Sequence, residues 1–189
     1  MSKLLSHKTN EANWKPYSRL YHPGLSALQL SWLLDTSSLT QRLIAGSGGQ
    51  FQVEVISEQW VKPMLSEREL LGMNSDVLAR VRHVRLMCNG QPCVFARTVI
   101  PYTTLRGPVR RLSMLGNKSL GAVLFADPTM RRGDLEIAAI GKNDFLYEQA
   151  MKGIRQIRHH ICGRRSLFYL SGKPLLVNEI FLPGIEKLK

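Results

Sequence analysis

The fold is decided by one stretch near the C-terminus, which reads Gly163-Arg164-Arg165-Ser166-Leu167-Phe168-Tyr169-Leu170-Ser171-Gly172-Lys173-Pro174-Leu175-Leu176-Val177-Asn178-Glu179-Ile180-Phe181-Leu182-Pro183. It predicts two extended segments, residues 166–170 and 175–182, joined by a turn at residues 171–174. Glycine supplies the positive φ of a tight turn, and proline is tolerated at the first residue of a strand. We therefore expect an antiparallel hairpin that closes the domain.

The second of these strands carries a single carboxylate. Because successive side chains alternate between the two faces of a strand, Glu179 shares a face with Leu175, Val177 and Phe181. A carboxylate among apolar neighbours loses hydration and needs a partner. Either another side chain or a bound ligand is expected to satisfy it.

The same stretch resembles the signature of the chorismate pyruvate-lyase (chorismate lyase) family of ubiquinone biosynthesis. That signature runs Gly-Arg-Arg-Ser, Ser-Gly-Lys-Pro-Leu-Leu, and a Glu followed by Phe-Leu-Pro, and all three motifs occur here in order. The likeness continues upstream, weakly near the N-terminus and strongly after about residue 80, through the stretches 32–34, 39–43, 89–101, 104–108 and 115–125. It implies an α+β fold with a single antiparallel β-sheet flanked by helices.

Length and composition suit a single domain with a real hydrophobic core. The chain has 189 residues, of which 44% are hydrophobic, and no apolar run is long enough to span a membrane. The first ten residues lack the features of a signal peptide, so we expect a cytoplasmic protein. Cys88, Cys93 and Cys162 form no Cys-x-x-Cys pair, which predicts buried reduced thiols rather than disulfides or a zinc site.

The charge is strongly positive. Lys and Arg number 26 against 14 Asp and Glu, which gives a formal net charge of +12. Such a balance suggests nucleic acid, an anionic membrane surface or an anionic substrate as partner. The basic residues lie in small scattered clusters without a recognisable nucleic-acid-binding motif, so we expect no dedicated nucleic-acid partner. Chorismate carries two carboxylates and is attracted by the same field.

The order of elements favours α+β with an antiparallel sheet, because strands mix with helices that do not alternate regularly with them. Residues 1–24 are polar and are expected to form a partly ordered lead-in, followed by one domain at 25–189. Asn89-Gly90 is a strong hairpin signal. The expected strands are 51–57, 77–88, 93–102 and 135–140. The expected helices are 26–34, 38–44, 108–115, 119–126 and 145–160, and residues 62–75 are expected to form a loop with at most one helical turn.

Two arginines lie on apolar strand faces in the central hairpin. Alternation places Arg82 with Val84 and Leu86, and Arg97 with Phe95 and Val99. Two guanidinium groups and the carboxylate of Glu179 on such faces are unusual in a purely structural sheet. One interpretation is an internal ion pair, for example between Glu179 and Arg97, that fixes the sheet and binds nothing. The other is a ligand site.

The family resemblance implies a role for four of the residues. Arg82 would hold the ring carboxylate of substrate and product, and Glu179 would accept a hydrogen bond from the ring 4-hydroxyl. Backbone groups at Leu120 would help hold the carboxylate from the first turn of a helix, and Leu39 would contribute from a mobile flap. Arg binds carboxylates bidentately, which suits the first role. Arg97 is expected to support the site from behind or to contact the enolpyruvyl carboxylate.

The implied activity is conversion of chorismate to 4-hydroxybenzoate and pyruvate by elimination of the enolpyruvyl group. Aromatisation drives the reaction, so we expect no cofactor and no metal, and His159-His160 lacks other ligands at metal-binding spacing. A monomer subject to product inhibition is expected. Residues 141–161 are longer than the resemblance predicts, and their basic segment has no assigned role. The alternative is a non-catalytic sensor module of the same fold that binds an aromatic carboxylate.

Overall fold

The computed structural model describes residues 10–17, 25–156 and 158–188 of the chain. Its strands form one antiparallel sheet in the order β1-β6-β7-β8-β4-β3-β2, with β5 paired to β7. The predicted α+β fold with a single antiparallel sheet is confirmed. The strands are β1 (Lys15–Pro16), β2 (Phe51–Val61), β3 (Ala79–Cys88), β4 (Gln91–Pro101), β5 (Arg131–Arg132), β6 (Glu136–Gly141), β7 (His160–Leu170) and β8 (Lys173–Phe181).

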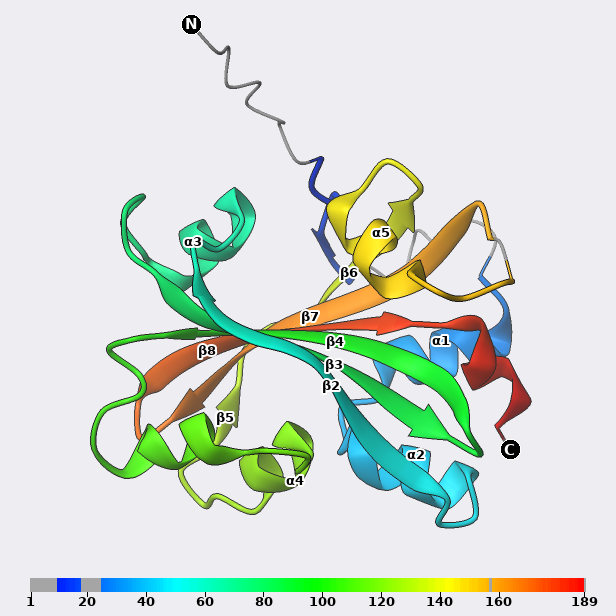
Figure 1. The fold of residues 1–189 in the computed structure, drawn as a ribbon, viewed down its shortest axis with the longest axis horizontal. Helices are drawn as coiled ribbons and strands as arrows, with labels where there is room; N and C mark the ends of the chain where they lie inside the picture. Colours follow the sequence, from blue (N-terminus) through cyan, green and yellow to red (C-terminus); the bar gives the residue numbers. More distant parts are fainter. Residues whose placement is uncertain (1–9, 18–24, 157, 189) are drawn as a thin grey trace, which may run out of the picture.

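Short helices cover both faces of the sheet (Figure 1). One face packs against α1 (Ala27–Leu34), α2 (Leu39–Gly46), the 3-10 helix η1 (Gly107–Met114) and α4 (Leu120–Phe125). The opposite face packs against α3 (Leu65–Leu71) and α5 (Phe145–Met151). A second 3-10 helix, η2 (Pro183–Lys187), follows β8. In the described part of the chain, none of the helices has the length and apolar character needed to cross a bilayer.

Both predicted hairpins are present, and their turns have the backbone geometry that the sequence requires. Asn89 and Gly90 both have positive φ, 51° and 70°, between β3 and β4. Ser171 and Gly172 do the same, at 49° and 74°, between β7 and β8. Two consecutive residues with positive φ match the twist of antiparallel strands, which is why these turns connect neighbouring strands directly.

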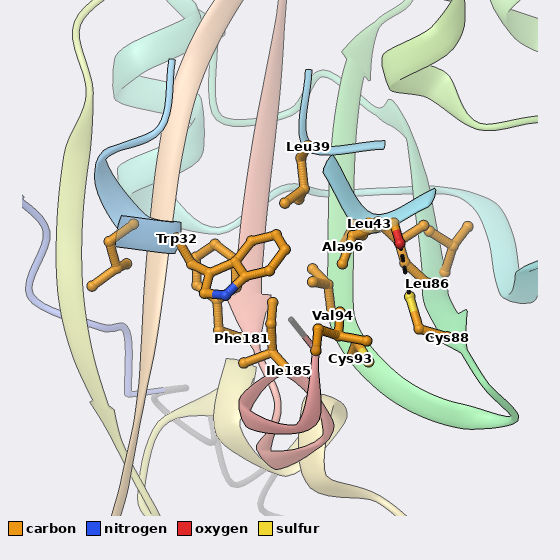
Figure 2. Close-up of a cluster of buried hydrophobic side chains, with 13 residues drawn as sticks. Trp32, Leu39, Leu43, Leu86, Cys88, Cys93, Val94, Ala96, Phe181 and Ile185 are labelled. Atoms are coloured by element: carbon orange, nitrogen blue, oxygen red, sulfur yellow. Dashed lines mark hydrogen bonds between the residues drawn. The ribbon is translucent and has the colours of Figure 1, made fainter. Parts of the chain in front are cut away.

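The largest apolar cluster lies between α1, α2 and the sheet. Figure 2 shows the side chains of Trp32 and Leu39 gathered against Val94, Ala96 and Phe181 of the central strands. Trp32 is only 2% exposed, and the cluster extends to η2 through a buried isoleucine. Burial of apolar area on this scale fixes the first two helices on the sheet, and with them one wall of the site described below.

The three cysteines are free thiols. Cys88 and Cys93 are buried, and Cys162 is half-buried. Burial raises the pKa of the Cys93 thiol to about 12 and that of Cys162 to about 11, so both stay protonated at neutral pH. Two of the three thiols are buried as predicted, and because the thiolate is the nucleophilic form, Cys93 and Cys162 are unsuited to nucleophilic catalysis.

One predicted element is wrong. The helix expected at residues 145–160 ends at Met151, and the chain then turns at Gly153, which has a φ of 77°. Strand β7 begins at His160, six residues earlier than the strand predicted at 166. The helix was predicted to continue to residue 160 because basic residues suit a helix C-terminus. The same residues are equally compatible with the start of a strand.

Two further segments differ in detail from the expectation. Residues 62–75 contain α3, which is longer than a single turn. Within the predicted lead-in, Lys15–Pro16 pairs with β6, and Trp14 packs into the core beside α5. Residues 1–9 and 18–24 of that lead-in lie outside the described residues.

Candidate active site

A cavity of about 50 Å³ lies between the sheet and the helices α2 and α4. Its floor comes from β3, β4, β7 and β8, and its walls come from β2, β5 and the two helices. The residues that line it include four of the five predicted for the site. The lining residues that carry the argument are Leu39, Arg82, Leu120, Arg132, Arg164 and Glu179.

The sheet register brings Arg82 and Glu179 to this cavity from the same face. Arg82 on β3 pairs with Thr98 on β4, whereas Glu179 on β8 pairs with Ala96 on β4. The two residues are therefore separated by one strand, or about 10 Å across the sheet. Both side chains line the same cavity. The face shared by Glu179 and Val177 was predicted correctly by alternation.

Arg82 is 2% exposed and only partly neutralised. Its Nη2 donates to the carbonyl oxygens of Gly116 (2.7 Å) and Lys118 (3.3 Å), in the loop before α4. Its Nη1 lies 3.5 Å from a carboxylate oxygen of Glu58, which binds Arg80 more closely at 2.7 Å. Burial lowers the pKa of Arg82 and the charge of Glu58 opposes that shift. An anion at this guanidinium would relieve the burial of an under-compensated charge.

Glu179 has one oxygen engaged and one available. Arg164, directly opposite on β7, donates from Nε to Glu179 Oε2 at 2.5 Å. Arg164 is 1% exposed, and its Nη1 also donates to the backbone carbonyl of Trp32 at 2.9 Å. Among the described residues, Glu179 Oε1 has no hydrogen-bond donor. The carboxylate is thus held in place while an acceptor oxygen remains free for a ligand hydroxyl.

The cavity as a whole is positive. Four basic side chains line it, against one carboxylate, so its formal charge is about three units positive if all are ionised. The basic residues are Arg82, Lys118, Arg132 and Arg164. The low-dielectric walls strengthen this field, which favours a ligand with more than one negative charge.

Helices α2 and α4 close the cavity where they meet. Thr40 Oγ1 and Ser119 Oγ lie 2.5 Å apart, joining the start of α2 to the N-cap of α4. A Cβ at Gly121 would lie 2.7 Å from Thr40 Oγ1, so this close approach requires glycine. Leu120 is the first residue of α4, as predicted, where backbone N–H groups lack acceptors within the helix. Leu39 opens α2 and lines both the cavity and the apolar cluster of Figure 2.

Arg97 does not reach this cavity. It lies on the opposite face of the sheet, where its Nε and Nη2 each donate to Glu67 of α3 at 2.8 Å. The ion pair between Glu179 and Arg97 that one interpretation suggested is therefore absent, because Glu179 lies opposite Ala96, and neighbouring residues of β4 point to opposite faces. Arg97 cannot contact a ligand in the cavity from this position. Arg97 Nη1 also donates to His83 Nε2 at 2.7 Å, so His83 belongs to the same network.

The prediction missed Arg132 and Arg164. Arg164 was quoted in the C-terminal motif, but the strand was expected to begin only at residue 166. Extending alternation back from Phe168, which lines the cavity, places Ser166 and Arg164 on the cavity face. Arg132 belonged to one of the small scattered basic clusters, and no local signal reveals that β5 folds against β7.

The described residues contain no group of three or more His, Cys, Asp or Glu side chains arranged to hold a metal ion. The absence of a cofactor from the reaction stays a prediction.

Sequence comparison finds close relatives over most of the chain. Residues 8–187 match the sequence family described as "Chorismate lyase". The chain is 41% identical over 157 residues to the "Probable chorismate pyruvate-lyase" of Methylobacillus flagellatus, covering 83% of this chain and 88% of the relative. It is 39% identical over 157 residues to the protein of the same name in Nitrosomonas europaea, with the same coverage.

Solved structures share the fold at low sequence identity. The C-terminal domain of a histidine utilization repressor from Pseudomonas syringae pv. tomato superposes with a TM-score of 0.54 at 10% identity, covering 71% of this chain and 92% of that one. A GntR-family transcriptional regulator from Bacillus cereus gives 0.52 at 15% identity, covering 71% and 93%. At such identities the likeness concerns the fold alone.

Proposed function

Because this chain belongs to the chorismate lyase family, we propose that it converts chorismate to 4-hydroxybenzoate and pyruvate, as the first committed step of ubiquinone biosynthesis. One observation carries the proposal. A buried arginine and a carboxylate with a free oxygen, Arg82 and Glu179, line one positive cavity from the same face of the sheet. A ring with an acidic group at one end and a hydroxyl at the other fits that pair of partners.

In the proposed complex, each end of the ring has its own donors or acceptors. Arg82 binds the ring carboxylate, assisted by the backbone N–H groups at the start of α4 near Leu120. Glu179 accepts a hydrogen bond from the 4-hydroxyl through Oε1, while Arg164 holds the other oxygen. Leu39 covers the ring from α2. These contacts orient the ring and exclude water, which are the tasks left to the protein in this reaction.

The proposed reaction balances without an added reagent. The bond between the ring C3 and the ether oxygen breaks, and its electron pair leaves with the enolpyruvate. The hydrogen on C4 leaves as a proton, the ring becomes aromatic, and the enolpyruvate gains a proton to become pyruvate. Aromatisation supplies the driving force, so the proposal includes neither a metal nor a redox cofactor.

Product inhibition follows from the same contacts. 4-Hydroxybenzoate keeps both the carboxylate and the hydroxyl, so Arg82 and Glu179 bind product as they bind substrate. Interactions made equally in substrate and product do not accelerate the reaction selectively, and they slow release. We expect competitive inhibition by 4-hydroxybenzoate in steady-state assays, and its complete absence would contradict this arrangement.

The direct test mixes purified protein with chorismate and measures pyruvate without added metal or nucleotide. We expect pyruvate and 4-hydroxybenzoate in equal amounts. Glu179→Ala is expected to lose most of this activity, whereas the exposed Glu186→Ala, which lies outside the cavity, should retain it. Failure of the wild-type protein to release pyruvate above the spontaneous rate would refute the proposed activity.

The fold also supports a second candidate, a sensor that binds an aromatic carboxylate without converting it. The observation in its favour is the shared fold with transcriptional regulators. Thermal stabilisation by 4-hydroxybenzoate with no pyruvate released from chorismate would favour the sensor. We further propose a cytoplasmic monomer without a dedicated nucleic-acid partner. Sedimentation analysis and salt-dependent DNA binding test the last two points.

A further inference from the structure

Arg132 differs from the other two arginines of the cavity in its partners. Arg82 has Glu58 and Arg164 has Glu179, whereas Arg132 has no carboxylate partner within the described part of the chain. Its Nε donates to Ser166 Oγ at 3.1 Å, and its Nη1 donates to the backbone carbonyl of Thr36 at 3.3 Å. Both acceptors are neutral. The guanidinium therefore brings a positive charge into the cavity that nearby acceptors orient but do not neutralise.

Arg132 lies beyond Glu179 as seen from Arg82. Across the sheet the order runs from Arg82 on β3, through β4, to Glu179 on β8, then β7, and then Arg132 on β5. Burial lowers the pKa of Arg132, the neighbouring positive Arg164 adds to that shift, and the charges of Glu179 and, more weakly, Asp35 oppose it without forming an ion pair. The cavity thus has one cationic end at Arg82 and another at Arg132 and Arg164, with the acceptor oxygen of Glu179 between them.

Chorismate has a matching order of groups. Its ring carboxylate lies opposite the hydroxyl-bearing carbon, and its second carboxylate belongs to the enolpyruvyl ether on the carbon next to that hydroxyl. If Arg82 binds the ring carboxylate and Glu179 the hydroxyl, the enolpyruvyl carboxylate lies near Glu179, at the far end from Arg82. Arg164 is already occupied there by Glu179 and backbone carbonyls. Arg132 is the cation near Glu179 that retains unneutralised charge.

We propose that Arg132 binds the enolpyruvyl carboxylate of chorismate and so distinguishes the substrate from the aromatic product. The inference rests on the proposed function, because it takes the position of the ring from Arg82 and Glu179. It assigns to Arg132 the role that the sequence had suggested for Arg97. 4-Hydroxybenzoate has no second carboxylate, so Arg132 contributes to substrate binding and not to product binding.

The test compares two stable ligands that differ in the carboxylate concerned. 4-Hydroxybenzoate has only the ring carboxylate, and 3-(carboxymethoxy)-4-hydroxybenzoate adds an ether-linked carboxylate next to the hydroxyl. Calorimetry measures both affinities for the wild-type protein, for Arg132→Gln, and for Arg131→Gln. Arg131 is exposed, faces away from the cavity and loses the same charge, so it is the matched control.

We expect Arg132→Gln to weaken the dicarboxylate by about 10- to 100-fold, as for loss of a charge-assisted hydrogen bond, and 4-hydroxybenzoate by less than about 3-fold. Arg131→Gln should change neither affinity. In turnover, Arg132→Gln should raise KM for chorismate while the inhibition constant of 4-hydroxybenzoate stays unchanged. Equal losses for both ligands would mean that Arg132 only braces Thr36 and Ser166, and would overturn the inference.

Unchanged affinity for both ligands in Arg132→Gln would also overturn it. Failure of the proposed function has a different signature. If the wild-type protein releases no pyruvate but binds the dicarboxylate more tightly through Arg132, the role of Arg132 is supported and the proposed lyase activity is refuted. If it releases pyruvate but Arg132→Gln shows no selectivity, the activity stands and this inference fails. Binding of neither ligand by the wild-type protein would refute both.

Discussion

The two faces of the sheet use the same residue types for different purposes. On the face covered by α3, Arg97 and Glu67 form a bidentate pair with both distances at 2.8 Å, and both side chains are almost completely buried. Glu67 also accepts from Asn178 Nδ2 at 3.1 Å and from the backbone N–H of Met64 at 3.0 Å. Each oxygen of the Glu67 carboxylate therefore has two donors from the protein, and the charges of this network are paired with each other. Asn178 Oδ1, at the edge of this closed network, has no hydrogen-bond partner in the described part of the chain.

The cavity face leaves its charges incompletely paired. Arg82 shares Glu58 with Arg80, which binds it more closely, Arg132 donates only to neutral acceptors, and Glu179 has an oxygen without a donor in the described part of the chain. Buried charge costs free energy unless it is paired, so a protein retains such a set only where something else completes it. A buried arginine therefore does not by itself identify a binding site, since Arg97 is buried and fully paired. A binding site is indicated where buried arginines beside a cavity lack a full complement of carboxylate partners.

The largest effect should come from breaking the closed network. We expect Glu67→Ala to lower the free energy of unfolding by about 3–5 kcal/mol, because it leaves Arg97 buried without a counter-charge. Urea denaturation of the wild-type and variant proteins measures it. The control is Arg158→Ala, which removes an exposed ion pair to Glu186 and should change stability by at most about 1 kcal/mol. Similar losses in the two variants would break the distinction.

The reverse behaviour is expected at Arg82. Arg82→Ala should lower kcat/KM for chorismate by about 100-fold or more, since charge-assisted hydrogen bonds to a desolvated carboxylate contribute about 1.5–3 kcal/mol each. Its stability should change by less than about 1 kcal/mol, as for a residue kept for function. Steady-state pyruvate release and urea denaturation measure the two quantities. Arg85→Ala, on the same strand but outside the cavity, should keep full activity. Normal turnover in Arg82→Ala would remove Arg82 from the site.

The sequence predicted the residues of the cavity face better than those of the opposite face. Alternation placed Arg82 and Glu179 correctly on apolar faces, and the C-terminal motifs indicated the family. Alternation showed which residues of β4 share a face with Arg97. It could not show that the other face lines the cavity, because that depends on how the helices pack against the sheet. Glu67, its true partner, lies in a segment expected to be mainly loop. Pairing between distant segments is a tertiary property that local pattern does not encode.

Arg132 shows the same limit more sharply. Its strand has two residues, too few for any periodic signal, and its place in the cavity depends on pairing with β7 over thirty residues later. The start of β7 was not predicted either, because residues 152–165 combine glycines with basic residues that suit either a helix end or a strand. The recognisable motifs thus gave part of the site, and the sheet register supplied the rest.

The closed network should also respond to pH through His83. Burial, and then the charge of Arg97, lowers the pKa of His83 from 6.5 to about 4, so the folded protein keeps the ring neutral. As pH falls from about 6.5 to about 4 the unfolded state takes up a proton first, so the free energy of unfolding should fall by up to about 3 kcal/mol.

Below the pKa of about 4 both states are protonated, and this contribution changes no further. His83→Gln removes the titrating group, so the difference in stability between wild type and variant should shrink across that window. Urea denaturation at a series of pH values measures it. A pH dependence that is identical in the two proteins would show that His83 does not couple protonation to folding. Carboxylates titrate in both proteins, so the difference between the two pH profiles reports on His83 alone.

The smallest effect is expected where the cavity is closed. Thr40→Val removes the 2.5 Å hydroxyl contact between α2 and α4 while keeping the shape of the side chain. We expect a stability loss of about 1 kcal/mol, typical of one hydrogen bond. Because the contact joins the two helices that border the cavity, 4-hydroxybenzoate should also dissociate faster, with an activation free energy lower by about 1 kcal/mol or less. Stopped-flow displacement measures that rate, and Ser31→Ala, whose hydroxyl lies outside the cavity, is the control. Equal dissociation rates in Thr40→Val and the wild type would show that the Thr40–Ser119 contact does not limit ligand release.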